Sequence, residues 1–183
     1  SFSPAKRLGE AGAQGPVWDI AASESNVYVV WVGKPTTPAD TLGDIFFRAS
    51  NDNGVNFNTV VALSPTLGLS YYPRIAASGR NVYVVWMDPF LTGDFSCSIP
   101  FRVSKNGGIS FSPTFWVSGG TYPTIAAVRG KVHIAWQVDW LKGEIRYRFA
   151  WLFNEPPIAN AGPDQFVNEG AEVKLDGTGS FDG

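Results

Sequence analysis

The stretch that decides the fold has three parts: Tyr-Pro-Arg-Ile-Ala-Ala-Ser (72–78), Asn-Val-Tyr-Val-Val-Trp (81–86) and Ile-Pro-Phe-Arg-Val-Ser-Lys-Asn-Gly-Gly-Ile-Ser-Phe (99–111). Each of the three parts has a counterpart upstream and another downstream. The tryptophan that ends the second part, for example, recurs as Trp31 and as Trp136, at a spacing of about 50 residues. Self-similarity at a regular spacing identifies a repeat protein.

The repeated segments are short, rich in β-branched and aromatic residues, and separated by polar or glycine-containing turns, which predicts β-strands. The first strand of each unit is predicted at 20–23, 75–78 and 125–128, the second at 27–31, 82–86 and 132–136, and the third at 45–50, 99–104 and 145–150. Fourth strands are predicted at 56–63 and 110–117, and the third unit has no matching segment after its third strand.

The second strand of the middle unit predicts how the sheets are layered. Because side chains alternate along a strand, Val82, Val84 and Trp86 point to one face, and Tyr83 and Val85 point to the other. Both faces are apolar, so each sheet must pack between two similar sheets. The sequence therefore predicts an all-β fold of three antiparallel four-stranded propeller-type blades. Closed propellers have about 4–8 blades, so these three make an incomplete ring.

A short motif, S-x-D-x-G-x-x-F, connects the predicted third and fourth strands at 50–57, and it recurs with Asn for Asp at 104–111. A short carboxylate or amide can accept hydrogen bonds from the backbone of its own turn, and glycine can take a positive φ. We expect the aromatic residue to hold the turn against the sheet. The structural residues of the two turns are Ser50, Asp52, Gly54 and Phe57, and Ser104, Asn106, Gly108 and Phe111.

This motif resembles the Asp-box of bacterial-neuraminidase (BNR) repeats in sialidase-like β-propellers, and the resemblance covers residues 1 to about 153. Asn154-Glu155-Pro156-Pro157 is a typical linker, and a domain boundary is predicted near residue 154. The remainder, 154–183, resembles the start of a PKD-type (polycystic-kidney-disease-type) β-sandwich, an Ig-like β segment. The segments that carry the second resemblance are 156–165, 173–177 and 179–183.

The resemblance to sialidases implies an arginine cluster, a tyrosine paired with a glutamate, and an aspartate acid/base. Arg74 is nearest to the arginine motif of that family, and Asp88 and Asp94 are candidate catalytic carboxylates in a loop insert. No complete catalytic constellation is present, so the sequence favours a protein that is not an enzyme. Three arginines recur at one position of the third strand, which indicates a structural role in pairing with turn carboxylates or backbone carbonyls: Arg48, Arg102 and Arg148.

Other side chains are candidates for binding. Trp116, Trp140 and Trp151 lie outside the repeated tryptophan positions and are candidates for stacking on sugars. Asp164, Asp176 and Asp182 are candidate ligands for Ca²⁺, and no other cofactor is expected. His133 and Cys97 are the only residues of their types, which excludes multi-histidine and cysteine-based metal sites. His133 is expected to pack between blades, because it occupies the repeat position of Tyr28 and Tyr83.

Composition limits the class of partner. Only 16% of the 183 residues are charged and the net charge is −2, so no basic surface for nucleic acid is expected. No apolar run reaches the roughly 18 residues that a membrane-spanning helix needs.

The sequence therefore predicts a non-catalytic extracellular or cell-surface module, structural or adhesive. Its expected partners are other copies of itself, further domains of a longer chain, or glycans. Ser1-Phe2-Ser3-Pro4 repeats Ser110-Phe111-Ser112-Pro113, so the segment 1–8 could complete the third unit of a neighbouring copy. The alternative is a fragment of a secreted sialidase-type glycoside hydrolase or a carbohydrate-binding propeller.

Overall fold

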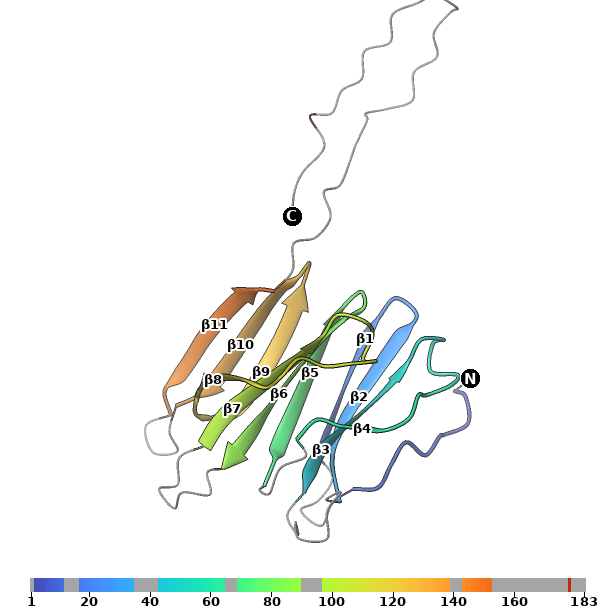
Figure 1. Ribbon diagram of the computed structural model, residues 1–183, viewed down its shortest axis with the longest axis horizontal. Helices are drawn as coiled ribbons and strands as arrows, with labels where there is room; N and C mark the ends of the chain where they lie inside the picture. The colour runs from blue at the N-terminus through green and yellow to red at the C-terminus, as the bar shows by residue number, and fades with distance from the viewer. Residues whose placement is uncertain are drawn as a thin grey trace, which may run out of the picture.

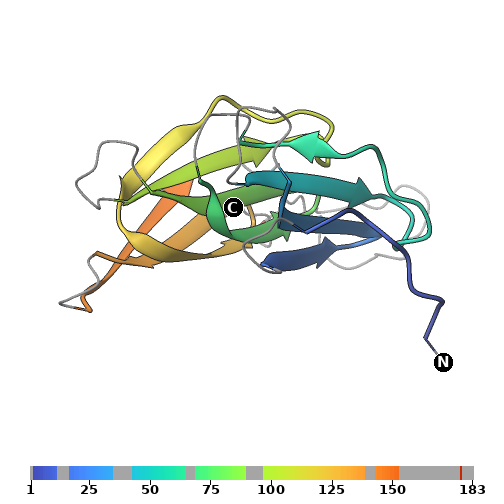
Figure 2. The ribbon, with the colours of Figure 1, turned by 90° about the horizontal axis from the view of Figure 1, so that it is seen from below.

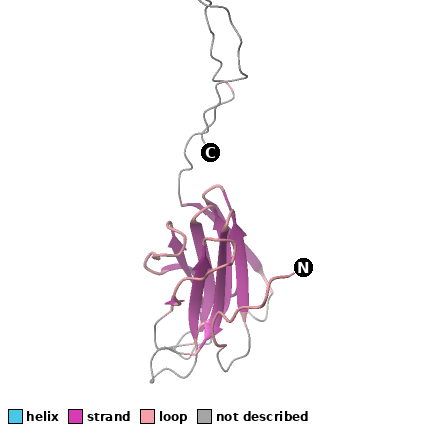
Figure 3. Cartoon of the chain, turned by 90° about the vertical axis from the view of Figure 1, so that its right-hand side faces the viewer, coloured by secondary structure: helices cyan, strands magenta, loops and turns pink. Residues whose placement is uncertain are grey.

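The computed structural model describes residues 2–11, 17–34, 43–64, 69–89, 97–138, 143–152 and 178, and all regular elements in these ranges are β-strands (Figure 3). They form three antiparallel sheets. Sheet 1 contains β1 (Trp18–Ser23), β2 (Asn26–Gly33), β3 (Asp44–Ser50) and β4 (Val61–Ala62). Sheet 2 contains β5 (Tyr71–Ser78), β6 (Asn81–Pro89), β7 (Cys97–Ser104) and β8 (Phe115–Gly119). Sheet 3 contains β9 (Thr121–Val128), β10 (Lys131–Gln137) and β11 (Ile145–Trp151).

Within each sheet the strands follow one another in chain order, each paired with its predecessor. The all-β class and the antiparallel pairing agree with the sequence prediction. Sheet 3 has three strands in the described part of the chain, so the prediction of a fourth strand for this sheet stays a prediction. The predicted boundary near residue 154 and the PKD-like segment lie outside the described residues, apart from Thr178.

The fourth strands are shorter than predicted and begin later. Arg48 donates through Nε to the carbonyl oxygen of Asn58 (2.6 Å) and through Nη2 to that of Phe57 (3.1 Å), so its side chain engages the backbone where β4 was expected to start. In sheet 2, Pro113 has no N–H to donate to a ladder, and β8 begins only at Phe115. Regular pairing therefore starts after these positions.

Sheet 2 is buried on both faces, as its sequence predicts. Val84 faces sheet 1 in one apolar cluster and Val85 faces sheet 3 in another, and neither side chain is exposed. Figures 1 and 2 show the three sheets next to one another, with sheet 1 at one end of the stack and sheet 3 at the other. The first strands of neighbouring sheets lie side by side, β1 beside β5 and β5 beside β9.

The two end sheets have different cover on their outer faces. Gly9 lies directly over the Trp31 ring, and Ala11 forms a bridge with Gly33, so the N-terminal segment 6–11 covers part of sheet 1. The outer face of sheet 3 has no such cover among the described residues, and every residue of β11 is exposed. His133, expected between two blades, lies on this uncovered face, because no described sheet follows sheet 3.

Candidate functional site

The two turns that follow β3 and β7 have the same hydrogen-bond pattern. Ser50 Oγ donates to Asp52 Oδ1 (2.7 Å) and accepts from Gly54 N (2.9 Å), while Asp52 Oδ1 accepts from Asn56 N (2.7 Å). The hydrogen bonds from the Asn56 backbone and from Ser50 lower the pKa of Asp52 to about 2. The same bonds recur in the second turn at the matching positions Ser104, Asn106, Gly108 and Ser110. Both turns are organised by their own polar groups, which is a structural role.

The second turn also joins sheet 2 to sheet 1. The Phe111 ring lies edge-on to the Phe47 ring with 5.0 Å between centroids. A Cβ atom on Gly108 would lie 2.3 Å from Phe47, whereas one on Gly54 would meet only Phe57, at 4.0 Å. The glycine of the second turn is therefore required by packing as well as by its positive φ of 84°.

The recurring arginines bind backbone carbonyl groups or a hydroxyl. Arg48 Nη1 donates to the Leu8 carbonyl (3.1 Å), and Arg148 Nη1 donates to the Val117 carbonyl (2.7 Å). Arg102 Nε donates to Thr114 Oγ1 (3.0 Å). Arg48 and Arg148 thus tie their own sheets to segments that lie against the sheet face, and no arginine triad forms among these positions.

Asp88 lies at the end of β6 in a largely buried position. Its Oδ1 accepts hydrogen bonds from Ser70 Oγ (2.7 Å) and from Trp86 Nε1 (2.9 Å). Burial raises the pKa of Asp88 to about 6, and the charge of Asp44 adds to this shift. A carboxyl group with this pKa can exchange a proton near neutral pH.

Arg74 lies on β5 opposite Val85, which precedes Asp88 by three residues on β6. Within the described ranges no hydrogen bond or ion pair joins the Arg74 and Asp88 side chains. Asp94, the other candidate carboxylate, lies outside the described residues. Asp88 therefore has a raised pKa, but no hydrogen bond or ion pair among the described residues connects it to the candidate Arg74.

Two tyrosines on the first strands form a pair that sequence analysis missed. Tyr72 and Tyr122 have φ values of 48° and 50°, which are rare for bulky side chains, and their rings meet edge-on with 4.9 Å between centroids. Backbone strain of this kind is concentrated at binding and catalytic sites. A signal was present in the sequence, because each tyrosine precedes a proline and lies three residues before Ile75 or Ile125.

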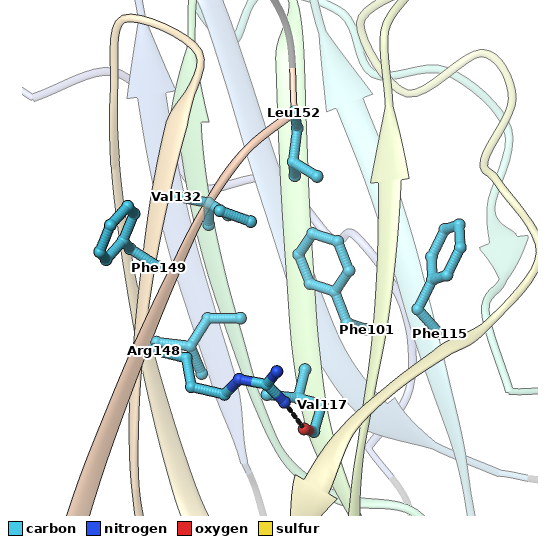
Figure 4. A pocket seen from close by; sticks show the side chains of 9 residues that line it. Phe101, Phe115, Val117, Val132, Arg148, Phe149 and Leu152 are labelled. Carbon is cyan, nitrogen blue, oxygen red and sulfur yellow. Dashed lines mark hydrogen bonds between the residues drawn. The ribbon is translucent and has the colours of Figure 1, made fainter.

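An apolar cavity of about 230 Å³ lies between sheets 2 and 3 (Figure 4). Phe101, Phe115 and Val117 line it from sheet 2, and Val132 and Arg148 are among the residues that line it from sheet 3. Figure 4 shows the hydrogen bond from Arg148 to the Val117 carbonyl crossing one end of this cavity. β8 of sheet 2 and β11 of sheet 3 both contribute to its lining.

The other predicted site residues are only partly described. Trp116 on β8 and Trp151 on β11 are both exposed, but they lie on different sheets. Trp140 and the candidate Ca²⁺ ligands lie outside the described residues: Asp164, Asp176 and Asp182. Among the residues that are described, no cluster of three or more His, Cys, Asp or Glu side chains could hold a metal. None of the described elements is a helix that could span a membrane.

Comparison with protein-family models and with curated proteins yields no match to this sequence. Among solved structures the chain is similar to Zg3597, a family 117 glycoside hydrolase of the marine bacterium Zobellia galactanivorans. Identity is 14% and the TM-score 0.42, over 79% of this chain and 56% of that one. A second structure is Trypanosoma rangeli sialidase in complex with 2,3-difluorosialic acid, with 10% identity and a TM-score of 0.41, over 79% of this chain and 32% of that one.

A third similar structure is an α-L-arabinofuranosidase from Clostridium thermocellum, with 11% identity and a TM-score of 0.27, over 74% of this chain and 68% of that one. These structures are glycoside hydrolases and a sialidase, and the chain spans about half or less of the length of the first two. With TM-scores below 0.5, neither their fold nor their activity is transferred to this chain.

Proposed function

We propose that this chain is a non-catalytic extracellular or cell-surface structural module that adheres to further copies of itself by end-to-end stacking of its sheets. One observation carries the proposal. Side chains that are buried between sheets in the interior of the stack have repeat counterparts at both ends, and these counterparts are exposed.

At the sheet 1 end, the contrast is between Ile75 and Ile20. Ile75 faces sheet 1 from β5 and is 5% exposed, whereas Ile20, its counterpart on β1, is 61% exposed on the outer face of sheet 1. Trp18, which lies on the same face of β1, is also exposed. The segment 6–11 covers Trp31 but leaves this part of the face open.

At the sheet 3 end, the contrast is between Phe47 and Tyr147. Phe47 is 1% exposed between sheets 1 and 2, and its counterpart Phe101 is buried between sheets 2 and 3. Tyr147 holds the same position in sheet 3 and is 57% exposed, with Phe149 and Trp151 exposed beside it. Apolar surface of this kind on one sheet face is typical of an interaction site.

The two exposed faces are the two halves of one interface. Inside the stack, the Tyr147-type face of each sheet packs on the Ile20-type face of the next. A second copy placed in the same relation would cover the Tyr147 face of the first copy with its own Ile20 face. Such a head-to-tail contact is heterologous, so it produces rings or open filaments.

Sedimentation velocity over a range of protein concentrations tests this proposal. Tyr147→Lys and Ile20→Lys each place a charge in one half of the interface, and each is expected to weaken association at least about tenfold. Ile109→Lys is the matched control, because Ile109 is equally exposed on the second turn and belongs to neither face.

A mixing experiment separates head-to-tail stacking from other contacts. Tyr147→Lys protein retains an intact sheet 1 face and Ile20→Lys protein retains an intact sheet 3 face, so a mixture of the two should form a heterodimer. A wild-type chain that remains monomeric at all concentrations, or a control variant that dissociates as readily as the others, would count against stacking.

The second candidate is glycan binding, in a carbohydrate-binding propeller or a fragment of a secreted sialidase-type glycoside hydrolase. The observation that favours it is the strained pair Tyr72 and Tyr122. Tyr122 is exposed, and a tyrosine ring on a rigid strand suits the apolar face of a sugar. Asp88, with its pKa raised to about 6, could supply a proton in a hydrolase.

A fluorogenic sialoside tests turnover, and saturation-transfer NMR with sialyllactose tests binding. Hydrolysis that is lost in Arg74→Ala and Asp88→Asn would establish the enzyme. Binding lost in Tyr122→Ala but retained in Trp116→Ala would assign the site to the tyrosine pair. The reverse result would assign it to the exposed tryptophan, and absence of both signals would remove the glycan candidate.

A further inference from the structure

The cavity between sheets 2 and 3 has a filled counterpart between sheets 1 and 2. There, the Phe111 ring from the fourth segment of sheet 2 packs edge-on against Phe47 of sheet 1. Phe101 occupies the position of Phe47 in sheet 2, and it lines the cavity. Among the described residues, no aromatic side chain from a fourth segment of sheet 3 takes the place that Phe111 takes in the first interface.

The N-terminal segment carries the sequence of the fourth segment that sheet 3 lacks among the described residues. Ser1-Phe2-Ser3-Pro4 is identical to Ser110-Phe111-Ser112-Pro113, so Phe2 is the counterpart of Phe111. Whereas Phe111 packs against the core, the Phe2 side chain is fully exposed. Figure 2 shows the start of this segment extending away from the sheets.

The N-terminal segment has the same position on sheet 1 that β8, the fourth strand of sheet 2, has on sheet 3. Leu8 stands six residues after Phe2, as Val117 stands six residues after Phe111. The Leu8 carbonyl accepts a hydrogen bond from Arg48 of sheet 1, and the Val117 carbonyl accepts one from Arg148 of sheet 3. The equivalent arginine therefore binds the equivalent carbonyl in both places.

We infer that the cavity is a socket for Phe2 of a second copy, whose segment 2–8 runs along β11 as the fourth strand of sheet 3. The inference rests on the proposed stacking and names the side chain that completes the interface. The segment lies on the outer face of sheet 1, which is the face that stacking brings against sheet 3. Docking therefore carries the segment of one copy to the open edge of β11 in the other.

The size and chemistry of the socket suit a phenyl ring. A dry cavity of about 150 Å³ lined by Leu, Ile and Phe binds benzene, and this cavity of about 230 Å³ has a lining that is apolar apart from Arg148. The open edge of β11 offers backbone groups for pairing with an added strand. An aromatic anchor together with strand pairing accounts for both the exposed Phe2 and the open edge.

Sedimentation equilibrium of the full chain and of Phe2→Ala tests the anchor. Phe2 is fully exposed in the single chain, so its removal leaves the fold intact, and the association constant is expected to fall about 10- to 100-fold. Ile109→Ala is the matched control and should associate as the wild type does. If the chain associates and Phe2→Ala associates equally well, this inference is overturned while the stacking proposal stands.

Photo-crosslinking locates the side chain directly. A chain with benzoylphenylalanine at position 2 is mixed with an isotopically labelled wild-type chain and irradiated, and the linked peptides are identified by mass spectrometry. Crosslinks between copies to Phe101, Phe115 or Ala150 support the socket. Crosslinks only within one chain, or crosslinks between copies at other residues, overturn the socket. In a second experiment the photoprobe replaces Phe115, and a crosslink from it to residues 153–183 also overturns the socket. A monomeric chain without intermolecular crosslinks overturns both the socket and the stacking.

Discussion

Asp88 is a largely buried carboxyl group that binds its proton more tightly in the folded chain than in the unfolded chain. Its folded pKa of about 6 lies above the ordinary value of 3.8. Binding of the proton by Asp88 therefore stabilises the folded chain. This stabilisation is fully present below the unfolded pKa of 3.8 and is lost as the pH rises through about 6. The difference between the two pKa values corresponds to at most about 3 kcal/mol.

Asp88→Asn is expected to remove this pH dependence. The amide oxygen that the substitution introduces can still accept hydrogen bonds from Ser70 and Trp86, and the amide carries no charge. The variant should be more stable than the wild type by up to about 3 kcal/mol near pH 8 and nearly equal to it near pH 4. Urea unfolding at both pH values measures this, and a variant that is less stable near pH 8 would contradict it.

At the residue scale, the sequence predicted polar turns better than sites. Ser50 and Asp52 are near each other in the chain, so their mutual hydrogen bonds follow from local spacing. The raised pKa of Asp88 depends on burial between sheets, which no local pattern reveals. The strain at Tyr72 and Tyr122 is likewise set by the bulges in pairing of β5 with β6 and β9 with β10.

At the scale of elements, the two turns match in sequence but differ in what they contact. Gly108 packs against Phe47 of the neighbouring sheet, whereas a Cβ atom on Gly54 would meet only Phe57, at 4.0 Å. Both glycines have positive φ values, 84° and 81°, so an alanine is strained by about 1–2 kcal/mol at either position. Only the alanine at 108 would also clash with a ring.

Gly108→Ala is therefore expected to lower the free energy of unfolding by about 1–3 kcal/mol more than Gly54→Ala does. Gly54→Ala is the matched control, since it makes the same substitution at the same place in the first turn. Chemical denaturation of both variants measures the difference. Equal losses in the two variants would show that backbone strain alone requires these glycines.

Strand positions were predictable where β-branched and aromatic residues repeat at matching places in the three units, as in β2, β6 and β10. Short turns join β1 to β2 and β5 to β6, and these hairpins follow from the local sequence. The fourth strands were predicted less well, because pairing there depends on Arg48 and Pro113 as well as on apolar alternation. For sheet 3 the repeat predicts a fourth strand, but the sequence offers no matching segment after β11, so local pattern alone does not place that strand.

At the scale of the whole molecule, the repeats explain both the core and the open ends. A sheet that is apolar on both faces is buried on both faces only in the middle of the stack, where Val84 and Val85 lie. The end sheets carry the same pattern and expose it, except where the segment 6–11 lies over sheet 1. The sequence predicted that further copies or domains cover the outer faces of the end sheets. The exposed strand β11 is where we expect one such contact to form.

Amide hydrogen exchange of β11 at low and at high protein concentration tests the central claim most directly. Strand addition at the edge of sheet 3 predicts that alternate amides of Ile145–Trp151, which point away from β10, become protected at high concentration in the wild type. The same amides should be less protected in Phe2→Ala at the same concentration. Equal exchange of these amides in the wild type at both concentrations would contradict the account.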